Sequence, residues 1–296
     1  MRIVSLLPSA TETLFAVGAG DQVVGVTFEC DYPAAARSRR IVSTSALPVG
    51  LSAADIDRVV AERLRAGEDL YHLDEGALAD LDADLVVTQD LCAVCAVDVS
   101  VVDDALAHLG CRAEVLTVDP HRLDEVLNSV VQVGAATGHT GMAQDLVDGL
   151  RRRLDHVERL VAGKRRPRVL VLEWTDPPFA PGHWVPDMVA SAGGHCALGT
   201  AGEKSYRVSW DTAMASAPEV VVVAPCGYHL EAAVDLAQTV VSQGKLPPGI
   251  PVWAVDANAS FARPGPRLVD GVEALAAILH EDVFGPPAAA MARRIA

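Results

Sequence analysis

Short runs of β-branched residues alternate with stretches of helical hydrophobic spacing along most of the chain. In the first part, the pattern predicts strands at 3–7, 23–27, 84–88 and 113–118, and helices at 9–17, 51–64 and 101–109. Ser9-Ala10-Thr11-Glu12 matches a capping box, and Gly18 stands where a helix C-cap is expected. This alternation predicts a parallel sheet with crossover helices, in a first α/β lobe that ends near residue 120.

Residues 121–164 carry no strand pattern. Two stretches with helical spacing, 123–136 and 142–161, are interrupted only by a short polar segment, so a long helical element is expected there. After residue 166 the α/β pattern returns, with strands at 169–172, 220–223 and 252–255, helices at 186–192, 230–241 and 266–280, and a frayed tail at 286–296. The predicted organisation is an N-terminal α/β lobe (1–120), a helical linker with a long backbone helix (121–166) and a C-terminal α/β lobe (167–296).

The segments that follow the predicted strands hold most of the chemically distinctive residues. Ligands of open α/β sheets bind beyond the carboxyl ends of the strands, so we expect these segments to line a ligand-binding cleft between two doubly wound lobes. The segments are Phe28-Glu29-Cys30, Gln89 to Cys95, Glu173 to Phe179, and Pro225-Cys226-Gly227-Tyr228-His229.

Aromatic residues make up only 4% of the chain, yet Trp174, Trp184 and Trp210 all fall between residues 173 and 211, together with Phe179. Aromatic walls of this kind hold large planar apolar ligands, although such residues also cap the edges of sheets. His183, beside Trp184, could be an axial metal ligand or an exposed polar residue. Arg263 could donate hydrogen bonds to a ligand.

Four of the six cysteines lie at strand ends and allow a different interpretation. Cys92 and Cys95 form a C-x-x-C pair, which suits a metal ion, an iron–sulfur cluster or a redox disulfide, but also occurs as plain structural thiols. With Cys30 and Cys226, the pair could build a metal or iron–sulfur centre across the cleft and give the protein a redox or enzymatic role. The remaining cysteines resemble ordinary core residues.

Charge and hydropathy exclude several classes of function. The chain has 24 basic and 39 acidic side chains, and its net charge of −15 repels nucleic acid and anionic lipid surfaces. No apolar run approaches the roughly 20 residues of a membrane helix. Walker, Gly-x-Ser-x-Gly and His-Glu-x-x-His motifs are missing from the sequence, and Gly18-Ala19-Gly20 follows a helix rather than a strand. An ATPase or an α/β-hydrolase is therefore not expected.

Several segments together resemble the substrate-binding proteins of vitamin B12 ABC transporters, which are chelate receptors with a helical backbone. The resemblance rests on Arg2 to Glu12, Gly18-Ala19-Gly20, Val24 to Thr27, Asp31-Tyr32-Pro33, Asp84 to Val87, Pro177-Pro178-Phe179, Ala192-Gly193-Gly194 and Arg263 to Arg267. It covers nearly the whole chain. It implies two Rossmann-like lobes joined by a long backbone helix, with a corrinoid or other metal chelate bound between them.

The resemblance and the strand-end residues lead to one prediction: a binding protein for cobalamin or a related corrinoid. The expected ligand-binding residues are Phe28, Glu29, Gln89, Trp174, Phe179, His183, Trp184, Tyr228, Phe261 and Arg263. In the alternative, Cys30, Cys92, Cys95 and Cys226 ligate a metal ion or an iron–sulfur cluster instead.

The N-terminal sequence is the basis for predicting where the protein is located and whether a permease is its partner. Met1-Arg2 runs directly into a strand pattern without the basic and apolar segments of a signal peptide, which predicts a cytoplasmic protein. A periplasmic or lipid-anchored location is expected only if the sequence has been trimmed. An ABC permease would be a partner only of such an exported form, and the expected ligand is a small-molecule chelate.

Overall fold

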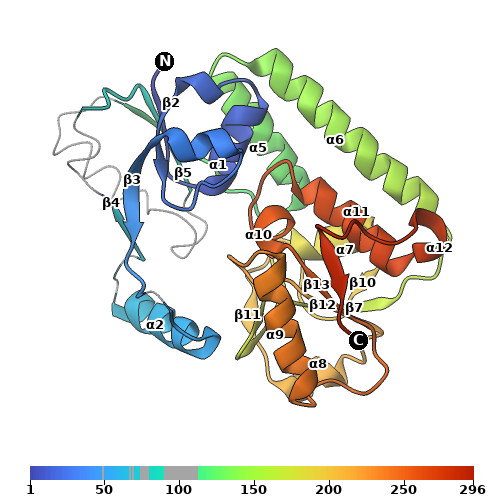
Figure 1. Cartoon of the computed structure of the whole chain (residues 1–296). Helices are drawn as coiled ribbons and strands as arrows, with labels where there is room; N and C mark the ends of the chain where they lie inside the picture. The colour runs from blue at the N-terminus through green and yellow to red at the C-terminus, as the bar shows by residue number, and fades with distance from the viewer. Residues whose placement is uncertain (49, 67, 69, 74–79, 90–112) are drawn as a thin grey trace. The chain divides into compact units, whose positions relative to one another are not determined.

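The computed structural model describes residues 1–48, 50–66, 68, 70–73, 80–89 and 113–296 (Figure 1). The chain forms two compact units. Unit 1 comprises Met1–Pro120 and Val126–Asp148, and unit 2 comprises His121–Glu125 and Gly149–Ala296. Each unit is built on a mainly parallel sheet, so the predicted α/β class with parallel sheets is confirmed.

The sheet of unit 1 has the order β4-β3-β2-β1-β5-β6, and only β4 is antiparallel to its neighbour. Its strands are β1 (Ile3–Ser5), β2 (Val23–Thr27), β3 (Arg40–Ser45), β4 (Tyr71–Leu73), β5 (Leu85–Thr88) and β6 (Glu114–Thr117). Helices α1 (Pro8–Ala16) and α2 (Ala53–Ala66) and the short helices η1 (Gly20–Gln22) and η2 (Ala34–Ser38) connect them. The helix expected at 101–109 lies outside the described residues.

The capping box predicted at Ser9 is wrong. Helix α1 begins one residue earlier, at Pro8, and its N-cap residue Leu7 makes no side-chain cap hydrogen bond. Ser9 and Glu12 are buried inside the helix. Proline is favoured in the first turn because its missing N–H would be unpaired there in any case, and this preference sets the start of the helix.

The main sheet of unit 2 has the order β10-β7-β12-β13-β14. Strands β10 (His195–Cys196), β7 (Arg168–Leu172), β12 (Val220–Val223) and β13 (Val252–Val255) are parallel. Strand β14 (Ala292–Arg294) pairs antiparallel with β13, so the expected frayed tail is wrong. Backbone pairing with the edge of a sheet orders the tail, although Ala-Arg-Arg carries no β-branched residue.

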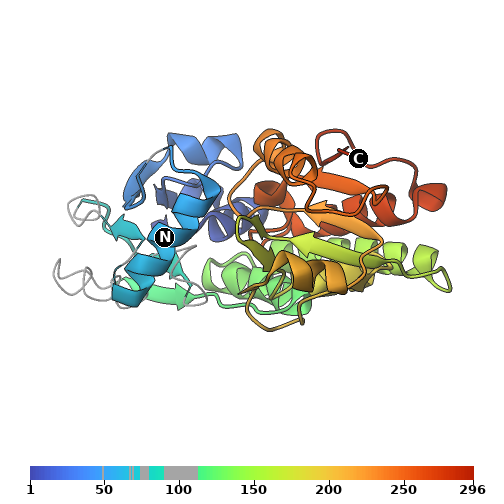
Figure 2. The same cartoon turned by 90° about the horizontal axis from the view of Figure 1, so that it is seen from below.

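Helices cover both faces of this sheet (Figures 1 and 2). Leu170, Leu172 and Val221 point to one face and pack against α8 (Trp210–Ala215) and α9 (Leu230–Ser242). The other face lies toward α7 (Val185–Ser191) and α11 (Leu268–Leu279), where Gly194 leaves room for side chains of both helices. Two short helices, α10 (Ala257–Ser260) and α12 (Glu281–Phe284), flank α11. The valine-rich strands form the core because both their faces are buried.

A second, three-stranded antiparallel sheet in unit 2 has the order β11-β9-β8. Its strands are β8 (Trp174–Thr175), β9 (Pro178–Ala180) and β11 (Tyr206–Arg207). Strand β8 begins two residues after the end of β7, so this small sheet stands at the carboxyl end of the main sheet.

Two long helices join the units. Helices α5 (Leu123–Ala136) and α6 (Thr140–Val161) agree closely with the predicted stretches, and both run through residues of unit 1 and unit 2. They approach each other so closely that a Cβ on Gly134 would lie 2.3 Å from the Cβ of Ala143. Among the described helices, none is both long and apolar enough to span a bilayer.

Candidate functional site

The strand orders mark where each unit can hold a ligand. In unit 1, strand β1 has β2 on one side and β5 on the other. In unit 2, strand β7 has β10 on one side and β12 on the other. The strand order therefore changes direction at β1 and at β7. In open parallel sheets, ligands bind at the carboxyl ends of the strands on either side of such a switch point. Gln89 directly follows β5, Trp174 lies just after β7, and Tyr228 lies in the loop after β12.

An aromatic contact lies at the switch point of unit 2. The rings of Trp174 and Tyr228 meet edge to face, with centroids 5.5 Å apart and an interplanar angle of 63°. The indole N–H of Trp174 donates to the carbonyl oxygen of Asp176 at 3.1 Å. Both side chains are half-buried, and burial raises the pKa of Tyr228. Two loops that are far apart in the sequence therefore present adjoining aromatic rings.

Backbone hydrogen bonds hold the loops after β7, β12 and β13 in register. The N–H of Cys226 donates to the carbonyl oxygen of Glu173 at 3.1 Å, and the N–H of Asn258 donates to that of Tyr228 at 3.0 Å. The carboxylate of Glu173 also accepts the N–H of Gly182 at 3.2 Å. The aromatic pair is therefore preorganised by main-chain bonds.

A polar cluster beside Tyr228 adds to this order. The carboxylate of Asp256 accepts the N–H of Ala259, which caps α10, and lies 3.1 Å from Nδ1 of His229. The other ring nitrogen of His229 lies 3.0 Å from the side-chain nitrogen of Asn258. An Asn amide can only donate from its nitrogen, so this contact favours the tautomer of His229 with a proton on Nδ1.

The small sheet carries a row of three side chains. Trp174 is directly opposite Phe179, and Phe179 is directly opposite Arg207. Residues opposite each other in antiparallel strands share one face of the sheet. The guanidinium carbon of Arg207 lies 5.8 Å from the ring centroid of Phe179, within cation–π range. Arg207 was not predicted from the sequence, because a two-residue strand has no periodicity to detect.

Two other predicted residues lie in the interior of unit 2. Trp184 is 6% exposed and Phe261 2% exposed, and the indole N–H of Trp184 donates to the carbonyl oxygen of Phe261 at 2.7 Å. Arg263 is also buried. These side chains support the loops from within.

His183 has an unusual backbone. Its φ of 49° lies in the left-handed region, and its N–H donates to the carbonyl oxygen of Glu203 at 2.6 Å. The ring centroid lies 6.0 Å from that of His121, and Nε2 is buried with no hydrogen-bond partner among the described residues. Burial lowers the pKa of His183, and His121 and Lys204 lower it further.

In unit 1, the predicted residues differ in exposure. Phe28 is exposed and Glu29 half-buried, whereas Cys30 is buried with its sulfur 3.0 Å from the hydroxyl of Thr11. Gln89 is only 4% exposed, and its side-chain oxygen has no hydrogen-bond partner among the described residues.

The cysteine alternative gains no support from the structure. Cys92 and Cys95 lie outside the described residues, Cys30 is buried, and Cys226 is exposed. Within the described ranges, no group of three or more His, Cys, Asp or Glu side chains could hold a metal ion.

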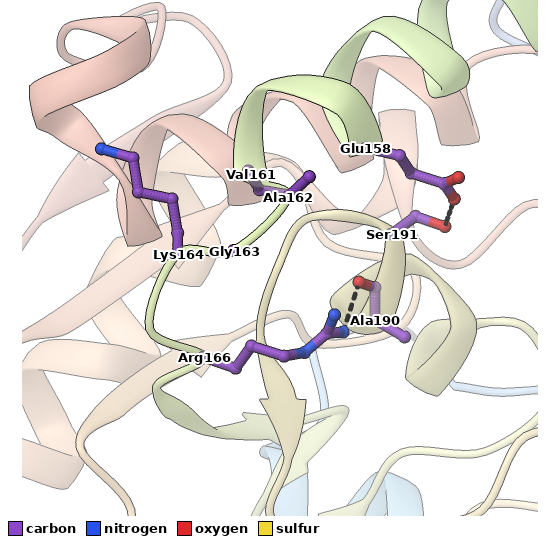
Figure 3. Close-up of a pocket in the computed structure, with 8 residues that line it drawn as sticks. All are labelled: Glu158, Val161, Ala162, Gly163, Lys164, Arg166, Ala190 and Ser191. Atoms are coloured by element: carbon purple, nitrogen blue, oxygen red, sulfur yellow. Dashed lines mark hydrogen bonds between the residues drawn. The ribbon is translucent and has the colours of Figure 1, made fainter.

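A surface hollow of about 300 Å³ lies elsewhere in unit 2, at the end of α6 (Figure 3). Its polar side chains already have partners: Ser191 donates to Glu158, Arg166 donates to the carbonyl oxygen of Ala190, and Lys164 donates to Asp282. None of the predicted ligand-binding residues lines this hollow.

Comparison with known proteins identifies the family. Residues 3–243 match the family model for periplasmic binding proteins, and the chain belongs to this family. It is a substrate-binding protein and not an enzyme, as predicted. Proteins of this family bind small molecules and work with ABC transporter permeases. No match was found among curated proteins.

Solved structures share the fold. A periplasmic heme binding protein from Pseudomonas aeruginosa has a TM-score of 0.71 at 19% identity, over 95% of this chain and 93% of that one. The periplasmic vitamin B12 binding protein BtuF of Vibrio cholerae has a TM-score of 0.66 at 22% identity, over 94% and 96%. The periplasmic heme-binding protein RhuT from Roseiflexus sp. RS-1, in apo form, has a TM-score of 0.67 at 22% identity, over 96% and 98%.

These findings confirm the family resemblance and correct one prediction. The cytoplasmic location is wrong, because the matching family consists of periplasmic binding proteins and the similar structures are periplasmic proteins. The prediction relied on the strand pattern at the start of the sequence, which is a weaker indicator of location than the family.

Proposed function

We propose that this protein binds a planar, metal-carrying tetrapyrrole, either a corrinoid such as cobalamin or a haem, and delivers it to an ABC permease. The observation that carries this proposal is the contact between Trp174 and Tyr228 at the switch point of unit 2. Cobalamin is the ligand expected from the sequence. The names of the similar structures, which include both vitamin B12 and heme binding proteins, support the broader class.

The aromatic residues suit a large flat ligand. Trp and Tyr provide large rigid contact areas at a low cost in conformational entropy, and each carries a polar group that can meet solvent. Trp174, Phe179 and Tyr228 are all half-buried, so each ring has surface to offer a ligand. Main-chain bonds already hold their loops, which lowers the cost of ordering on binding.

The remaining predicted residues take supporting roles in the proposal. Phe28, Glu29 and Gln89 would contribute contacts from unit 1, and the buried amide of Gln89 would meet a polar group of the ligand. His183 would lie at the edge of the site, while Trp184, Phe261 and Arg263 would hold its loops in place from inside unit 2.

Titration of the full chain with cyanocobalamin and, separately, with haemin tests the proposal. Absorption spectra and tryptophan fluorescence report binding. We expect at least one of the two ligands to bind with a Kd of about 1 μM or below. Trp174→Ala should weaken that binding roughly tenfold or more, because it removes a large aromatic contact area.

The matched control is Trp253→Phe. Trp253 is also half-buried in unit 2 but lies within β13, paired with Val222 and Arg294. This variant should bind as the unaltered protein does. The proposal fails if neither tetrapyrrole binds, or if Trp174→Ala binds as tightly as Trp253→Phe.

A further inference from the structure

We infer that helix α6 bends at Gly149 and that this bend lets the two units of the chain change their orientation. The division between the units falls at this residue, because unit 1 ends at Asp148 and unit 2 resumes at Gly149. Gly149 lies well inside α6, which runs from Thr140 to Val161. The inference goes beyond the proposed function and does not depend on which ligand the protein binds.

Packing does not require a glycine at this position. A Cβ on Gly149 would meet only the end of the Arg152 side chain, at 3.7 Å, and Gly149 is not among the glycines with a positive φ angle. Inside a helix, glycine is less favourable than alanine because its backbone loses more conformational freedom there. Gly149 therefore weakens α6 locally, and hinges are often formed by such small residues.

On the unit 1 side of Gly149, helix α6 is fixed against α5. A Cβ on Gly134 of α5 would lie 2.3 Å from the Cβ of Ala143. The N–H of His139 donates to the carbonyl oxygen of Gly134 at 2.7 Å, and the N–H of Ala143 donates to that of His139 at 3.0 Å. Ala143 and Val147 are both fully buried. This part of α6 therefore moves with unit 1.

On the unit 2 side, α6 is fixed against α11. Arg153 lies about one turn beyond Gly149. Its guanidinium donates to both carboxylate oxygens of Glu273, at 2.8 and 2.6 Å, and to Asp270 at 2.5 Å. Such a bidentate pair fixes the orientation of both side chains. Leu150 is also buried. Gly149 therefore lies between two fixed parts of one helix.

The other two crossings between the units lie on either side of the short segment His121–Glu125. One is in the loop before α5. The other is in the first turn of α5, which begins at Leu123 and where the N–H groups have no partner within the helix. Asp187 of α7 holds this segment to unit 2, since it accepts from the guanidinium of Arg122 at 2.8 Å and from the N–H of Leu123 at 3.3 Å. These crossings thus lie where a bend in α6 is easily accommodated.

Exchange of backbone amide hydrogens in the full chain, without a ligand, tests the bend. In a helix, the N–H groups of residues 150–153 bond to the carbonyl groups of residues 146–149, so opening at Gly149 exposes them. After correction for intrinsic rates, we expect these amides to exchange about tenfold or more faster than those of residues 155–158. Gly149→Ala should slow their exchange about fivefold, because alanine favours the helix.

The matched control is Gly141→Ala. A Cβ on Gly141 would meet nothing within 4 Å, but this glycine lies in the first turn of α6, within unit 1. The control should leave exchange at residues 150–153 unchanged. Because alanine is tolerated sterically at both positions, we expect both variants to fold.

A second measurement asks whether the units move. Spin labels on unnatural amino acids replace the exposed residues Arg37 in unit 1 and Gln238 in unit 2, so that the native cysteines stay unlabelled. Pulsed electron paramagnetic resonance then gives the distribution of distances between the labels. Gly149→Ala should narrow this distribution, and Gly141→Ala should leave its width unchanged.

The inference holds if the fast exchange at residues 150–153 is slowed only by Gly149→Ala and the distance distribution narrows with it. Equal protection at residues 150–153 and 155–158, or equal slowing by Gly141→Ala, would refute it. Slower exchange without a narrower distribution would also refute it, because the glycine would then loosen the helix without moving the units. Failure of both tetrapyrroles to bind would overturn the proposed function and leave this inference standing.

Discussion

Gly182→Ala is expected to disrupt the loops of unit 2 more than its size suggests. A Cβ at this position would lie 2.2 Å from the backbone nitrogen of Ser205 and 2.5 Å from the carbonyl oxygen of Glu203. Ordinary contacts between heavy atoms begin near ~3.5 Å, so the two segments would have to separate by about 1 Å. Neither contacting atom belongs to a side chain that could rotate away.

The separation would break hydrogen bonds that join the same segments. His183 donates its N–H to Glu203 at 2.6 Å, and Gly202 donates to His183 at 3.0 Å. Two lost hydrogen bonds cost about 1 kcal/mol each, and overpacking adds roughly 1–3 kcal/mol. The free energy of unfolding should therefore fall by about 3–5 kcal/mol, a large share of the ~5–15 kcal/mol of a typical domain.

Urea unfolding followed by tryptophan fluorescence measures this loss. The control is Gly149→Ala in α6, where a Cβ would meet only the end of the flexible Arg152 side chain at 3.7 Å. Alanine stabilises a helix interior by up to about 1 kcal/mol relative to glycine, so this variant should unfold at equal or higher urea. If Gly182→Ala unfolds within about 0.5 kcal/mol of the unaltered protein, the packing argument is refuted.

Three further outcomes follow from individual side chains. Burial lowers the pKa of His183, so the unfolded chain takes up a proton before the folded one, and the free energy of unfolding should fall as the pH drops below about 6.5. The urea midpoints near pH 7.5 and near pH 5 should therefore differ less for His183→Asn than for the unaltered protein, and an equal difference would contradict this. Trp184→Phe leaves the buried carbonyl oxygen of Phe261 without its donor, so the free energy of unfolding in urea should fall by about 1–3 kcal/mol. An unchanged free energy of unfolding would show that this hydrogen bond is dispensable. Burial raises the pKa of Cys196 to about 12, so iodoacetamide should alkylate the exposed Cys226 far faster than Cys196 in the native protein. Peptide mass spectrometry measures both rates, and equal rates would place Cys196 in solvent.

The parts of the fold that could be predicted from the sequence are the helices and strands whose bounds are set by the hydrophobic pattern alone. Strands 23–27, 220–223 and 252–255 and helix 123–136 have the predicted bounds, because buried β-branched runs and amphipathic spacing leave few alternatives. Strand β3, with two buried residues among exposed ones, and strand β14 were not predicted. Both are ordered by backbone pairing with a neighbouring strand, which the local sequence does not encode.

In the candidate site, too, some residues could be predicted from the sequence and others could not. Trp174 and Tyr228 could be identified from their position after strands, and the structure brings their rings together. The burial of Trp184 and Phe261 could not be foreseen, because it depends on packing between α7 and α10 regions that are distant in sequence. Arg207 joins the row only through the register of the small sheet, which no local signal specifies.

The most direct test of the proposed function is a crystal structure of the full chain grown with the tetrapyrrole that binds it. We expect a macrocycle in contact with the rings of Trp174 and Tyr228 at the carboxyl ends of β7 and β12. A macrocycle bound elsewhere, for example in the hollow at the end of α6, with both rings left in solvent, would contradict it.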